Sequence, residues 1–344
     1  MSSATALLFV RGRAPTPCSG TPGYAGDVGF ANDKSRRVLV DFWAAHLEMA
    51  PSRARLYCGG VAAGYVCYAL YRRWSRGVPL RGANVVISGA SAGIGAALAK
   101  ECAKRGSKVY LLARNEEALD KVVAEIGREN AVALRCDCSD PAQVAKIAED
   151  VGVPTVLVNN AGAGAWRFLN EAPASDVSFC LGAPYVAAAL LSREFAPKMI
   201  RSGNKSSILA VQSPAGLLAV PGATSYVCAR WALRGLHESL VQDCYGSSVN
   251  SQMAVFGEVS SEYFSTNAGA ADRLPKIAKW LMPILTPEAA AVVAADQIES
   301  GRAVVFAPFM LRVVAGLNHL CAPAVRALVV ATSSVSSADF ARGA

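Results

Sequence analysis

From residue 83 onward, short apolar runs alternate with longer segments of helical periodicity, and this alternation limits the possible folds more than any other feature. The runs are rich in β-branched residues and almost continuously apolar, which is typical of strands buried on both faces of a parallel sheet. Seven strands are predicted, over 84–88, 108–113, 131–136, 155–158, 206–211, 250–256 and 303–306. Helices are expected between them, for example over 93–105, 116–128 and 225–245. Repeated strand–helix units predict an α/β fold, a doubly wound parallel sheet with helices on both faces.

The rest of the chain divides by composition. Residues 1–54 are predicted to be a leader, because the first 26 contain two arginines, no acid and many Ser, Thr, Ala and Pro, as transit peptides and disordered leaders do. Residues 55–76 are predicted to form a hydrophobic helix, residues 81–307 a single α/β domain, and residues 308–344 apolar C-terminal helices with a polar tail.

The hydrophobic helix contains sixteen successive uncharged residues, 56–71, with arginines on both sides. As a helix this stretch is about 24 Å long, shorter than the ~30 Å hydrocarbon core of a bilayer. Flanking arginines and interfacial aromatic residues can make up that difference by snorkelling. We therefore predict a membrane anchor; a buried or docking helix is the alternative.

The formal net charge of +8 is unevenly distributed. Residues 1–80 hold ten of the 34 basic side chains and four of the 26 acidic ones, so they account for +6 of the total. The remaining residues are nearly neutral, which argues against a nucleic-acid-binding face. The ten cysteines include no C-x-x-C pair, and the three histidines give no zinc pattern. We interpret the cysteines as reduced and mostly buried, and the protein as intracellular.

A glycine-rich segment follows the first predicted strand and opens the first helix of the domain. Its sequence is Gly89-Ala-Ser91-Ala-Gly93-Ile94-Gly95. Glycines here allow a tight turn and a close approach to a pyrophosphate, and the helix N-terminus adds amides and a positive dipole end. These five residues are the first candidates for a dinucleotide site.

The G-x-x-x-G-x-G spacing resembles the short-chain dehydrogenase/reductase family, and later motifs extend the resemblance over 83–260. Asp137 follows the third strand, where the family has an adenine-contacting acid. Asn159-Asn160-Ala161-Gly162 matches the family motif N-N-A-G, which implies that Asn159 and Gly162 border the cofactor. The resemblance implies a Rossmann-like fold with an NAD(P) cofactor.

Arg114 follows the second strand, where an enzyme that uses NAD would have an acid for the ribose hydroxyl. A guanidinium can pair with a 2′-phosphate, so NADP(H) is favoured over NAD(H). An ion pair between Arg114 and Glu116 or Glu117 at a helix start is the alternative role.

Ser213 and Tyr226 are thirteen positions apart, as the catalytic serine and tyrosine of the family are. The resemblance implies that Tyr226 is the general acid or base and that Ser213 hydrogen-bonds the substrate oxygen. A tyrosine ordinarily ionises near pH ~10, so it needs a neighbouring cation to work near neutrality.

Two positions depart from the family pattern. Arg230 stands where the family has lysine, and Pro184 stands where it has an asparagine that holds a relay water; Cys180 is an alternative alignment for that asparagine. Arginine can stabilise a tyrosinate but does not release its proton. The hypothesis is an active enzyme with Ser213, Tyr226 and Arg230 as its catalytic residues. The alternative is an NADP(H)-binding pseudoenzyme or scaffold at a membrane.

The substrate side is predicted after the sixth strand. Residues 256–259 stand where the family has P-G-x-V, and 260–285 are expected to form a lid over an apolar substrate. Its candidate apolar residues are Tyr263, Phe264, Leu274, Trp280, Leu281 and Met282, with Trp166 and Phe168 on the other wall. Residues 301–338 contain no acid, and Arg312, His319 and Arg326 recur every seven positions. These features suit either a helix in a membrane interface or helices that cap the pocket.

These features together predict a membrane-associated, NADP(H)-dependent oxidoreductase. It would act on the carbonyl or alcohol of a lipophilic substrate such as a sterol, a retinoid or a long acyl chain. Membrane lipid is an expected partner, nucleic acid is not, and the resemblance implies a possible homodimer. The endoplasmic reticulum is the expected location, with plastid and mitochondrion as alternatives.

Overall fold

The structure, a computed structural model, describes residues 63–64, 77–260 and 270–342, apart from the side chains of 271, 272, 279, 281 and 337. Contacts divide the chain into two units, Met1–Val66 and Cys67–Ala344. The described part of the first unit is Ala63 and Gly64, which are helical. The predicted leader and nearly all of the predicted anchor helix therefore lie outside the described residues.

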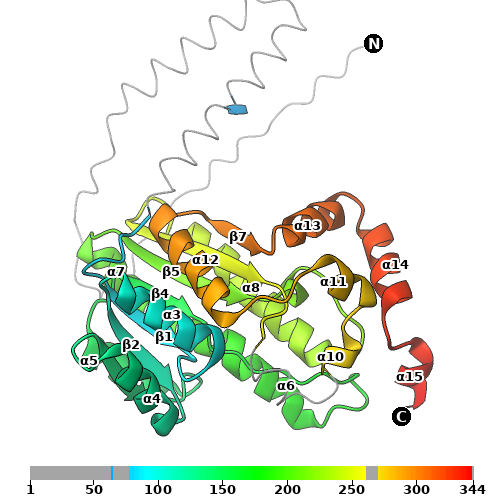
Figure 1. The fold of residues 1–344 in the computed structure, drawn as a ribbon, viewed down its shortest axis with the longest axis horizontal. Helices are drawn as coiled ribbons and strands as arrows, with labels where there is room; N and C mark the ends of the chain where they lie inside the picture. Colours follow the sequence, from blue (N-terminus) through cyan, green and yellow to red (C-terminus); the bar gives the residue numbers. More distant parts are fainter. Residues whose placement is uncertain (1–62, 65–76, 261–269, 343–344) are drawn as a thin grey trace, which may run out of the picture. The chain divides into compact units, whose positions relative to one another are not determined.

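Seven parallel strands form one sheet in the order β3-β2-β1-β4-β5-β6-β7 (Figure 1). They are β1 (Asn84–Ser88), β2 (Lys108–Ala113), β3 (Ala131–Arg135), β4 (Val156–Asn159), β5 (Ser206–Gln212), β6 (Val249–Phe256) and β7 (Val304–Ala307). Each strand begins and ends within one residue of its predicted bounds. The central strands β1, β4 and β5 are almost wholly buried, which explains why their sequences are continuously apolar.

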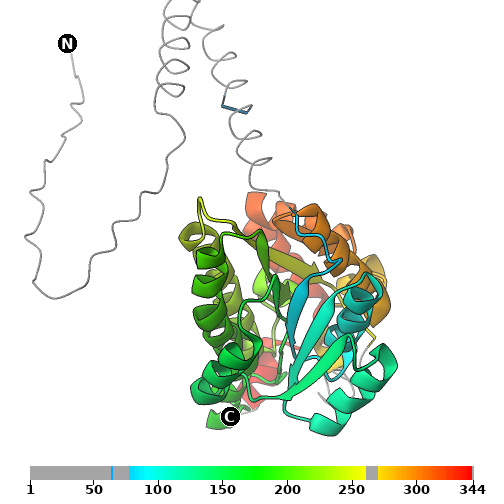
Figure 2. The ribbon, with the colours of Figure 1, turned by 90° about the vertical axis from the view of Figure 1, so that its left-hand side faces the viewer.

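Helices cover both faces of the sheet (Figure 2). One layer contains α3 (Gly93–Lys104), α4 (Glu116–Ile126) and α12 (Pro287–Ser300); the other contains α5 (Pro141–Val151), α7 (Ala187–Ser202) and α8 (Thr224–Asp243). Leu98 and Ala294 are fully buried in the first layer, as are Leu191 and Phe195 in the second. The predicted doubly wound fold is confirmed.

Side-chain caps explain where several helices begin. Asn115 Oδ1 accepts a hydrogen bond from Ala118 N (3.1 Å) at the start of α4. Asp140 and Thr286 cap α5 and α12 in the same way, and each is followed by a proline in the first turn. Such caps satisfy amides that a helix leaves unpaired at its N-terminus.

The remaining elements surround the carboxyl ends of the strands. They are α6 (Ala174–Leu181), a π-helical turn η1 (Gly182–Val186), a 3₁₀ turn η2 (Pro214–Gly216), α10 (Ala270–Arg273), α11 (Lys276–Leu281), α13 (Met310–Leu320), α14 (Ala322–Thr332) and α15 (Ser337–Arg342). The apolar C-terminal segment is broken at Cys321, and Pro323 lies in the first turn of α14, where proline is tolerated. Arg312 and Arg326 therefore belong to different helices.

One helical stretch, Ala174–Ser202, is long and apolar enough to cross a membrane by length and composition. It comprises α6, η1 and α7, and α7 packs Leu191, Phe195 and Met199 into the core beside the sheet. Of its most apolar window, 33% is buried within the described structure. The seven described cysteines are free, and five of them are buried.

Candidate functional site

A cavity of about 1010 Å³ lies at the carboxyl ends of the strands. The strand order reverses between β1 and β4, and ligands of open α/β sheets bind in the crevice beside such a reversal. The loops after β1 to β6 contribute to its lining, and so do α11, α13 and α14. All of the predicted site residues line this cavity except Gly95 and Asn159.

The glycine-rich segment forms a close-packed turn between β1 and α3. A methyl group on Gly95 would lie 2.2 Å from Gly89 O and 2.5 Å from Asn160 Nδ2, so no larger residue fits. Unlike α4, α5 and α12, helix α3 begins without a side-chain cap, and it has no acid in its first turn. Its first amides therefore face the cavity end without a side-chain partner in the described structure, which fits the pyrophosphate of a dinucleotide.

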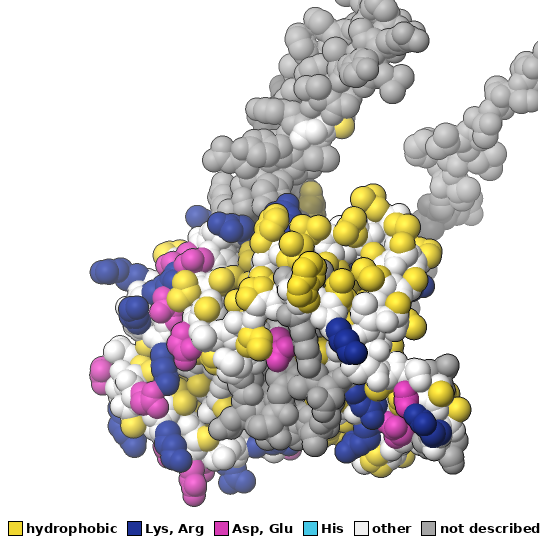
Figure 3. Space-filling view, turned by 45° about the vertical axis from the view of Figure 1, so that its right-hand side comes forward, with side chains coloured by type: hydrophobic (Ala, Val, Ile, Leu, Met, Phe, Trp, Pro, Cys, Tyr) yellow, Lys and Arg dark blue, Asp and Glu magenta, His cyan; other side chains and the backbone are white. Residues whose placement is uncertain are grey.

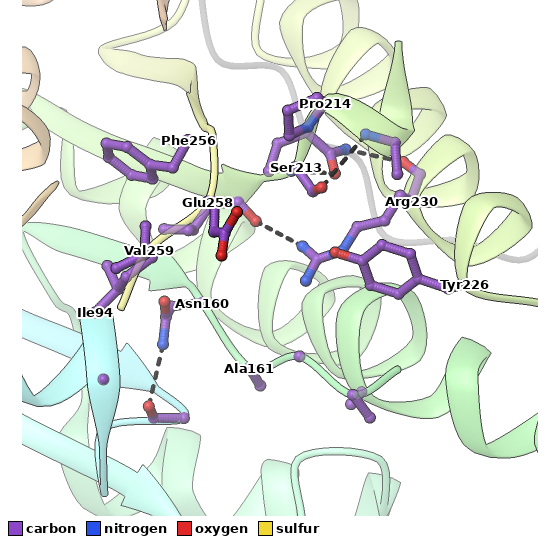
Figure 4. Close-up of a pocket in the computed structure, with 18 of the residues that line it drawn as sticks. Ile94, Asn160, Ala161, Ser213, Pro214, Tyr226, Arg230, Phe256, Glu258 and Val259 are labelled. Carbon is purple, nitrogen blue, oxygen red and sulfur yellow. Dashed lines mark hydrogen bonds between the residues drawn. The ribbon is translucent and has the colours of Figure 1, made fainter. Parts of the chain in front are cut away.

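Ser88 and Asn160 hold this turn against the loop after β4. Ser88 Oγ donates to Val158 O (3.2 Å) and accepts from Asn160 N (3.0 Å) and Ala161 N (3.1 Å). Asn160 Nδ2 donates to Ser88 O and Gly89 O, both at 3.0 Å (Figure 4). Asn160 belongs to the N-N-A-G motif, whereas Ser88 belongs to none of the predicted motifs.

Asn159, predicted to border the cofactor, lies on the other side of the strand end. Its Nδ2 donates to Ser192 Oγ (3.1 Å) on α7, while its buried Oδ1 has no partner among the described residues. Successive side chains at a strand end point to opposite faces, so Asn160 faces the cavity and Asn159 faces the core. Gly162, the last residue of the motif, does line the cavity.

Asp137 and Arg114 line the end of the cavity formed by β2 and β3. Asp137 Oδ1 accepts hydrogen bonds from Ser139 Oγ (2.6 Å) and Ser139 N (2.9 Å), and these bonds lower the pKa of the carboxyl. Arg114 is exposed and forms no ion pair within the described part of the chain, so the alternative pairing with Glu116 or Glu117 is not observed. Its guanidinium is available to a ligand.

Cys136 and Cys138 flank Asp137 and also line this end of the cavity. The two thiols hydrogen-bond each other, and this bond, together with burial, raises the pKa of Cys138. The same bond lowers the pKa of Cys136.

Ser213, Tyr226 and Arg230 meet where β5 ends and α8 begins (Figure 4). Tyr226 is 4% exposed and its ring stacks on Trp166, with centroids 5.5 Å apart. The Arg230 guanidinium lies 5.2 Å from the centroid of the Tyr226 ring, and Arg230 Nη1 donates to Val211 O (3.1 Å). A hydroxyl, a phenol and a buried cation thus converge on one part of the cavity, as carbonyl–alcohol chemistry requires.

The sequence profile described as short chain dehydrogenase matches residues 83–270, more than half of the chain. The chain belongs to the short-chain dehydrogenase family. It is therefore an oxidoreductase that uses a nicotinamide dinucleotide and acts on CH–OH groups.

Individual relatives agree with this membership. Epidermal retinol dehydrogenase 2 of Mus musculus is 27% identical over 249 residues, which cover 70% of this chain and 78% of the relative. 3-Ketodihydrosphingosine reductase of Bos taurus is 32% identical over 172 residues, covering 47% of this chain and 52% of the relative. The tropinone reductase homolog of Datura stramonium is 31% identical over 176 residues, which cover 49% of this chain and 64% of the relative.

Solved structures share the fold. A short-chain dehydrogenase/reductase from Burkholderia phymatum in complex with NAD superposes with a TM-score of 0.64 at 25% identity, covering 72% of this chain and 97% of that one. A short-chain dehydrogenase from Burkholderia cenocepacia in complex with NADP gives a TM-score of 0.63 at 21% identity, covering 74% of this chain and 99% of that one.

Arg230, predicted to stand where the family pattern has lysine, lies buried beside the cavity. The side chain is 8% exposed and makes no ion pair with a carboxylate of the described residues; its Nε also has no hydrogen-bond partner there. A methyl group on Gly162 would lie 2.9 Å from Arg230 Nη2, so glycine leaves the room that the guanidinium needs. The buried positive charge is directed at Tyr226 and the cavity.

Pro184 lies in the π-helical turn η1, between α6 and α7, and it is buried. Because proline has no N–H and its ring clashes with the preceding turn, Pro184 disfavours a regular α-helix at this position. Neighbouring Gly182 and Ala183 line the cavity. Cys180, the alternative alignment, is buried in α6, and burial raises the pKa of its thiol.

The cavity lining also includes two residues to which the sequence analysis gave no role. Glu258, after β6, directs its carboxylate into the cavity on the side that faces Arg230 (Figure 4). Gln212, the last residue of β5, is 2% exposed and hydrogen-bonds both Ser213 and Arg230. An expectation based on family motifs overlooks them because the motifs do not specify either position.

Much of the substrate side is apolar. It consists of Trp166, Leu218, Val220, Leu274, Ile277, Met282, Leu311, Val314, Val325, Leu328 and Val329. The C-terminal helices thus form part of the wall, which supports the capping alternative. Trp280 is 81% exposed and does not line the cavity, and Phe168 instead packs against Phe340 (5.5 Å between centroids). Tyr263 and Phe264 lie outside the described residues.

Proposed function

We propose that the protein is an NADP(H)-dependent oxidoreductase that interconverts the carbonyl and alcohol of a lipophilic substrate, with Tyr226 as general acid or base. The observation that carries this proposal is the convergence of Ser213, Tyr226 and the buried Arg230 between the glycine-rich turn and the apolar wall. The nicotinamide cofactor supplies or accepts the hydride when it is bound.

Side chains of the protein carry out the proton transfer. In the reductive direction the Tyr226 phenol donates its proton to the substrate oxygen as negative charge develops there, and the Ser213 hydroxyl donates a hydrogen bond to the same atom. The Arg230 guanidinium, 5.2 Å from the ring centroid, stabilises the resulting phenolate. Burial of Tyr226 and Arg230 strengthens this attraction because little water screens it.

Arg114 supports a preference for NADP(H). It is exposed at the end of β2, it lines the cavity, and no described carboxylate pairs with it. A 2′-phosphate beside it would gain a charge-assisted, bidentate contact.

The apolar wall supports a lipophilic substrate. Its aliphatic side chains come from α11, α13 and α14, and they would bury a long or polycyclic hydrocarbon and exclude water from the reacting atoms. The names of two relatives, a retinol dehydrogenase and a 3-ketodihydrosphingosine reductase, point to the same class of substrate.

The same helices support an association with an intracellular membrane, for which we propose the endoplasmic reticulum. Hydrophobic side chains gather on this side of the molecule (Figure 3). The most exposed are Trp280, Ile284, Phe309, Leu317, Leu320 and Val330. Arg312 and Arg326 are exposed among them, and residues 301–338 contain no acid. An apolar surface bordered by cations suits an anionic lipid interface. Membrane lipid is the partner that we propose; a homodimer stays a prediction.

The test is NADPH oxidation by the purified full chain over a panel of apolar ketones and aldehydes. We expect turnover with long-chain or polycyclic carbonyls and a loss of at least 10²-fold in Tyr226→Phe. Tyr245→Phe, which lies just beyond α8 and is 62% exposed, is the matched control and should retain activity. Arg114→Ala should raise KM for NADPH roughly tenfold and leave that for NADH unchanged.

The departures at Arg230 and Pro184 favour one alternative function, a non-catalytic NADP(H)-binding protein at a membrane. The panel separates the two functions. A wild type that binds NADPH with micromolar affinity and turns over none of the carbonyls would overturn the proposed activity and support the alternative.

A further inference from the structure

Gln212 ends β5 directly before Ser213, and its backbone is held in register with Val255 of β6. Both the oxygen and the nitrogen of its buried side-chain amide form hydrogen bonds. Oε1 accepts a hydrogen bond from Ser213 N (2.9 Å), and Nε2 donates one to Arg230 O (2.8 Å) on α8. A single side chain therefore links the strand that carries Ser213 to the helix that carries Tyr226 and Arg230.

Arg230 completes the link in the opposite direction. Its Nη1 donates to Val211 O (3.1 Å), the residue before Gln212. Each side chain thus holds the backbone of the other element, and we name this reciprocal pair the Gln212–Arg230 clamp. Gly216 makes room for it, because a methyl group there would lie 2.7 Å from Gln212 Cδ.

The clamp fixes two geometric quantities that the chemistry needs. Tyr226 lies one helical turn before Arg230 on the same face of α8, so holding Arg230 O also fixes the height of the phenol above the strand. Holding Ser213 N fixes the direction in which the serine hydroxyl leaves the strand. The anchoring bond to Val211 O keeps the guanidinium beside the phenol although no described carboxylate pairs with it.

We infer that Gln212 is a positioning residue, which sets the Arg230 cation and the Ser213 hydroxyl in place around Tyr226. This inference rests on the proposed function, since it assigns Gln212 a part in the same reaction. The alternative is that Gln212 only satisfies buried polar groups and stabilises the fold.

A second buried glutamine provides a matched control. Gln297 on α12 is 1% exposed, and its Nε2 donates to Met253 O (3.1 Å) and Arg302 O (3.0 Å). It joins α12 to the β6–β7 end of the sheet and does not line the cavity. Replacing either glutamine by methionine keeps the length of the side chain and removes its hydrogen bonds.

The experiment compares Gln212→Met with Gln297→Met in the full chain. Both variants should lose thermal stability to a similar degree. Only Gln212→Met should lower kcat for carbonyl reduction, by 10-fold or more, with the NADPH dissociation constant unchanged within twofold. If the wild type is active, equal kcat values in the two variants would overturn the inference.

A spectrophotometric titration of the Tyr226 phenol does not depend on turnover. The signal is the difference between each protein and its Tyr226→Phe counterpart. Gln212→Met should move the titration midpoint to higher pH, since a displaced guanidinium stabilises the phenolate less; Gln297→Met should leave it in place. The charged groups of the described cavity lining are Arg114, Asp137, Arg230 and Glu258, and neither substitution alters them.

The two readouts distinguish the possible failures. A wild type without turnover in which Gln212→Met still moves the titration would overturn the proposed activity and keep the positioning role. An unmoved titration would overturn the positioning role whatever the activity. If Gln212→Met does not fold, Gln212→Asn keeps a neutral amide on a side chain too short to reach both Ser213 N and Arg230 O, and the same upward movement is expected.

Discussion

Arg230 carries a buried positive charge beside Tyr226, the proposed general acid or base, without a contact ion pair in the described structure. Burying a cation costs free energy unless nearby groups compensate for the lost water. Here the carbonyl of Val211 and the face of the Tyr226 ring supply that compensation. The compensation grows when the phenol ionises, so the site stabilises the phenolate more than the phenol. An arginine can therefore serve the electrostatic function of the lysine that the family pattern has at this position.

We expect Arg230→Met to lower carbonyl reduction at pH 7 by roughly 10²-fold, because the phenolate loses its only adjacent cation in the described structure. Arg230→Lys restores the charge with a shorter side chain, and it should retain activity within about tenfold of the wild type. Steady-state kinetics at saturating NADPH measure both. If the lysine variant is no more active than the methionine variant, the charge of Arg230 is not its contribution.

The buried His237 makes stability depend on pH. It is 3% exposed, its Nδ1 lies 3.0 Å from Ser251 Oγ, and burial lowers its pKa. A histidine that is harder to protonate in the folded chain leaves stability intact above its unfolded pKa of about 6.5. As pH falls below that value the unfolded chain binds the proton first, so stability is lost until the folded pKa is reached.

Chemical denaturation between pH 7.5 and 5.5 should therefore show wild-type stability falling by on the order of 1 kcal/mol. The free energy of unfolding of His237→Gln should change little over this pH interval. His319→Gln, at an exposed position of α13, should follow the wild type. The described carboxyls with lowered pKa, such as Asp137, titrate below this interval. An identical slope in wild type and His237→Gln would contradict the assignment.

At the scale of elements, the sequence predicted the strands better than it predicted the surroundings of the cavity. Strands β1 and β4 were found because burial on both faces requires continuous apolar runs. The role of the C-terminal helices could not be derived in this way. Helix α14 is apolar on the side that bears Val325 and Val329, which line the cavity, and also at Val330, which is exposed. Periodicity does not tell which of two apolar faces points inward.

At the cofactor site, the sequence likewise did not predict which side chains face the cavity at the strand ends. The glycine spacing predicted the turn after β1, and the structure agrees because Gly95 has no space for a side chain. The choice between Asn159 and Asn160 depends on which way the chain leaves β4, and this is decided by the hydrogen bonds of Ser88. Such a choice depends on tertiary contacts, and a sequence motif does not contain them.

Helix α14 offers a direct test of the apolar wall. Val329→Asn places an amide in the cavity lining, and it should raise KM for an apolar carbonyl roughly tenfold while NADPH affinity stays unchanged. Val330→Asn introduces the same amide at the adjacent position, which is 60% exposed, and should have no effect on KM. Equal KM values for the two variants would mean that α14 does not contact the substrate.

At the scale of the whole molecule, the positive charge and the exposed apolar side chains suggest two separate membrane contacts. One is the predicted helix 55–76, which lies almost wholly outside the described residues. The other is the surface of α13 and α14, with Phe309 and Leu320 exposed near Arg312 and Arg326. The rest of the described domain adds little net charge, so the C-terminal helices are the lipid contact that we propose for residues 77–344.

A chain without residues 1–76 should still float with vesicles that contain anionic lipid, and less with neutral vesicles. Arg312→Glu combined with Arg326→Glu should weaken this binding about tenfold or more, because each arginine near the surface contributes about 1 kcal/mol. The double variant Arg128→Glu, Arg135→Glu, on the surface around β3, is the control. If both double variants float equally well, the C-terminal helices are not the lipid contact.

The cavity is also divided along the chain. Its glycine-rich turn and the ends of β2, β3 and β4 fall within residues 89–162, whereas α11, α13 and α14 contribute positions from 277 to 329. Ser213, Tyr226 and Arg230 lie between these two segments. Most of the apolar wall can therefore change through substitutions after residue 273 that leave the glycine-rich turn and these three residues untouched.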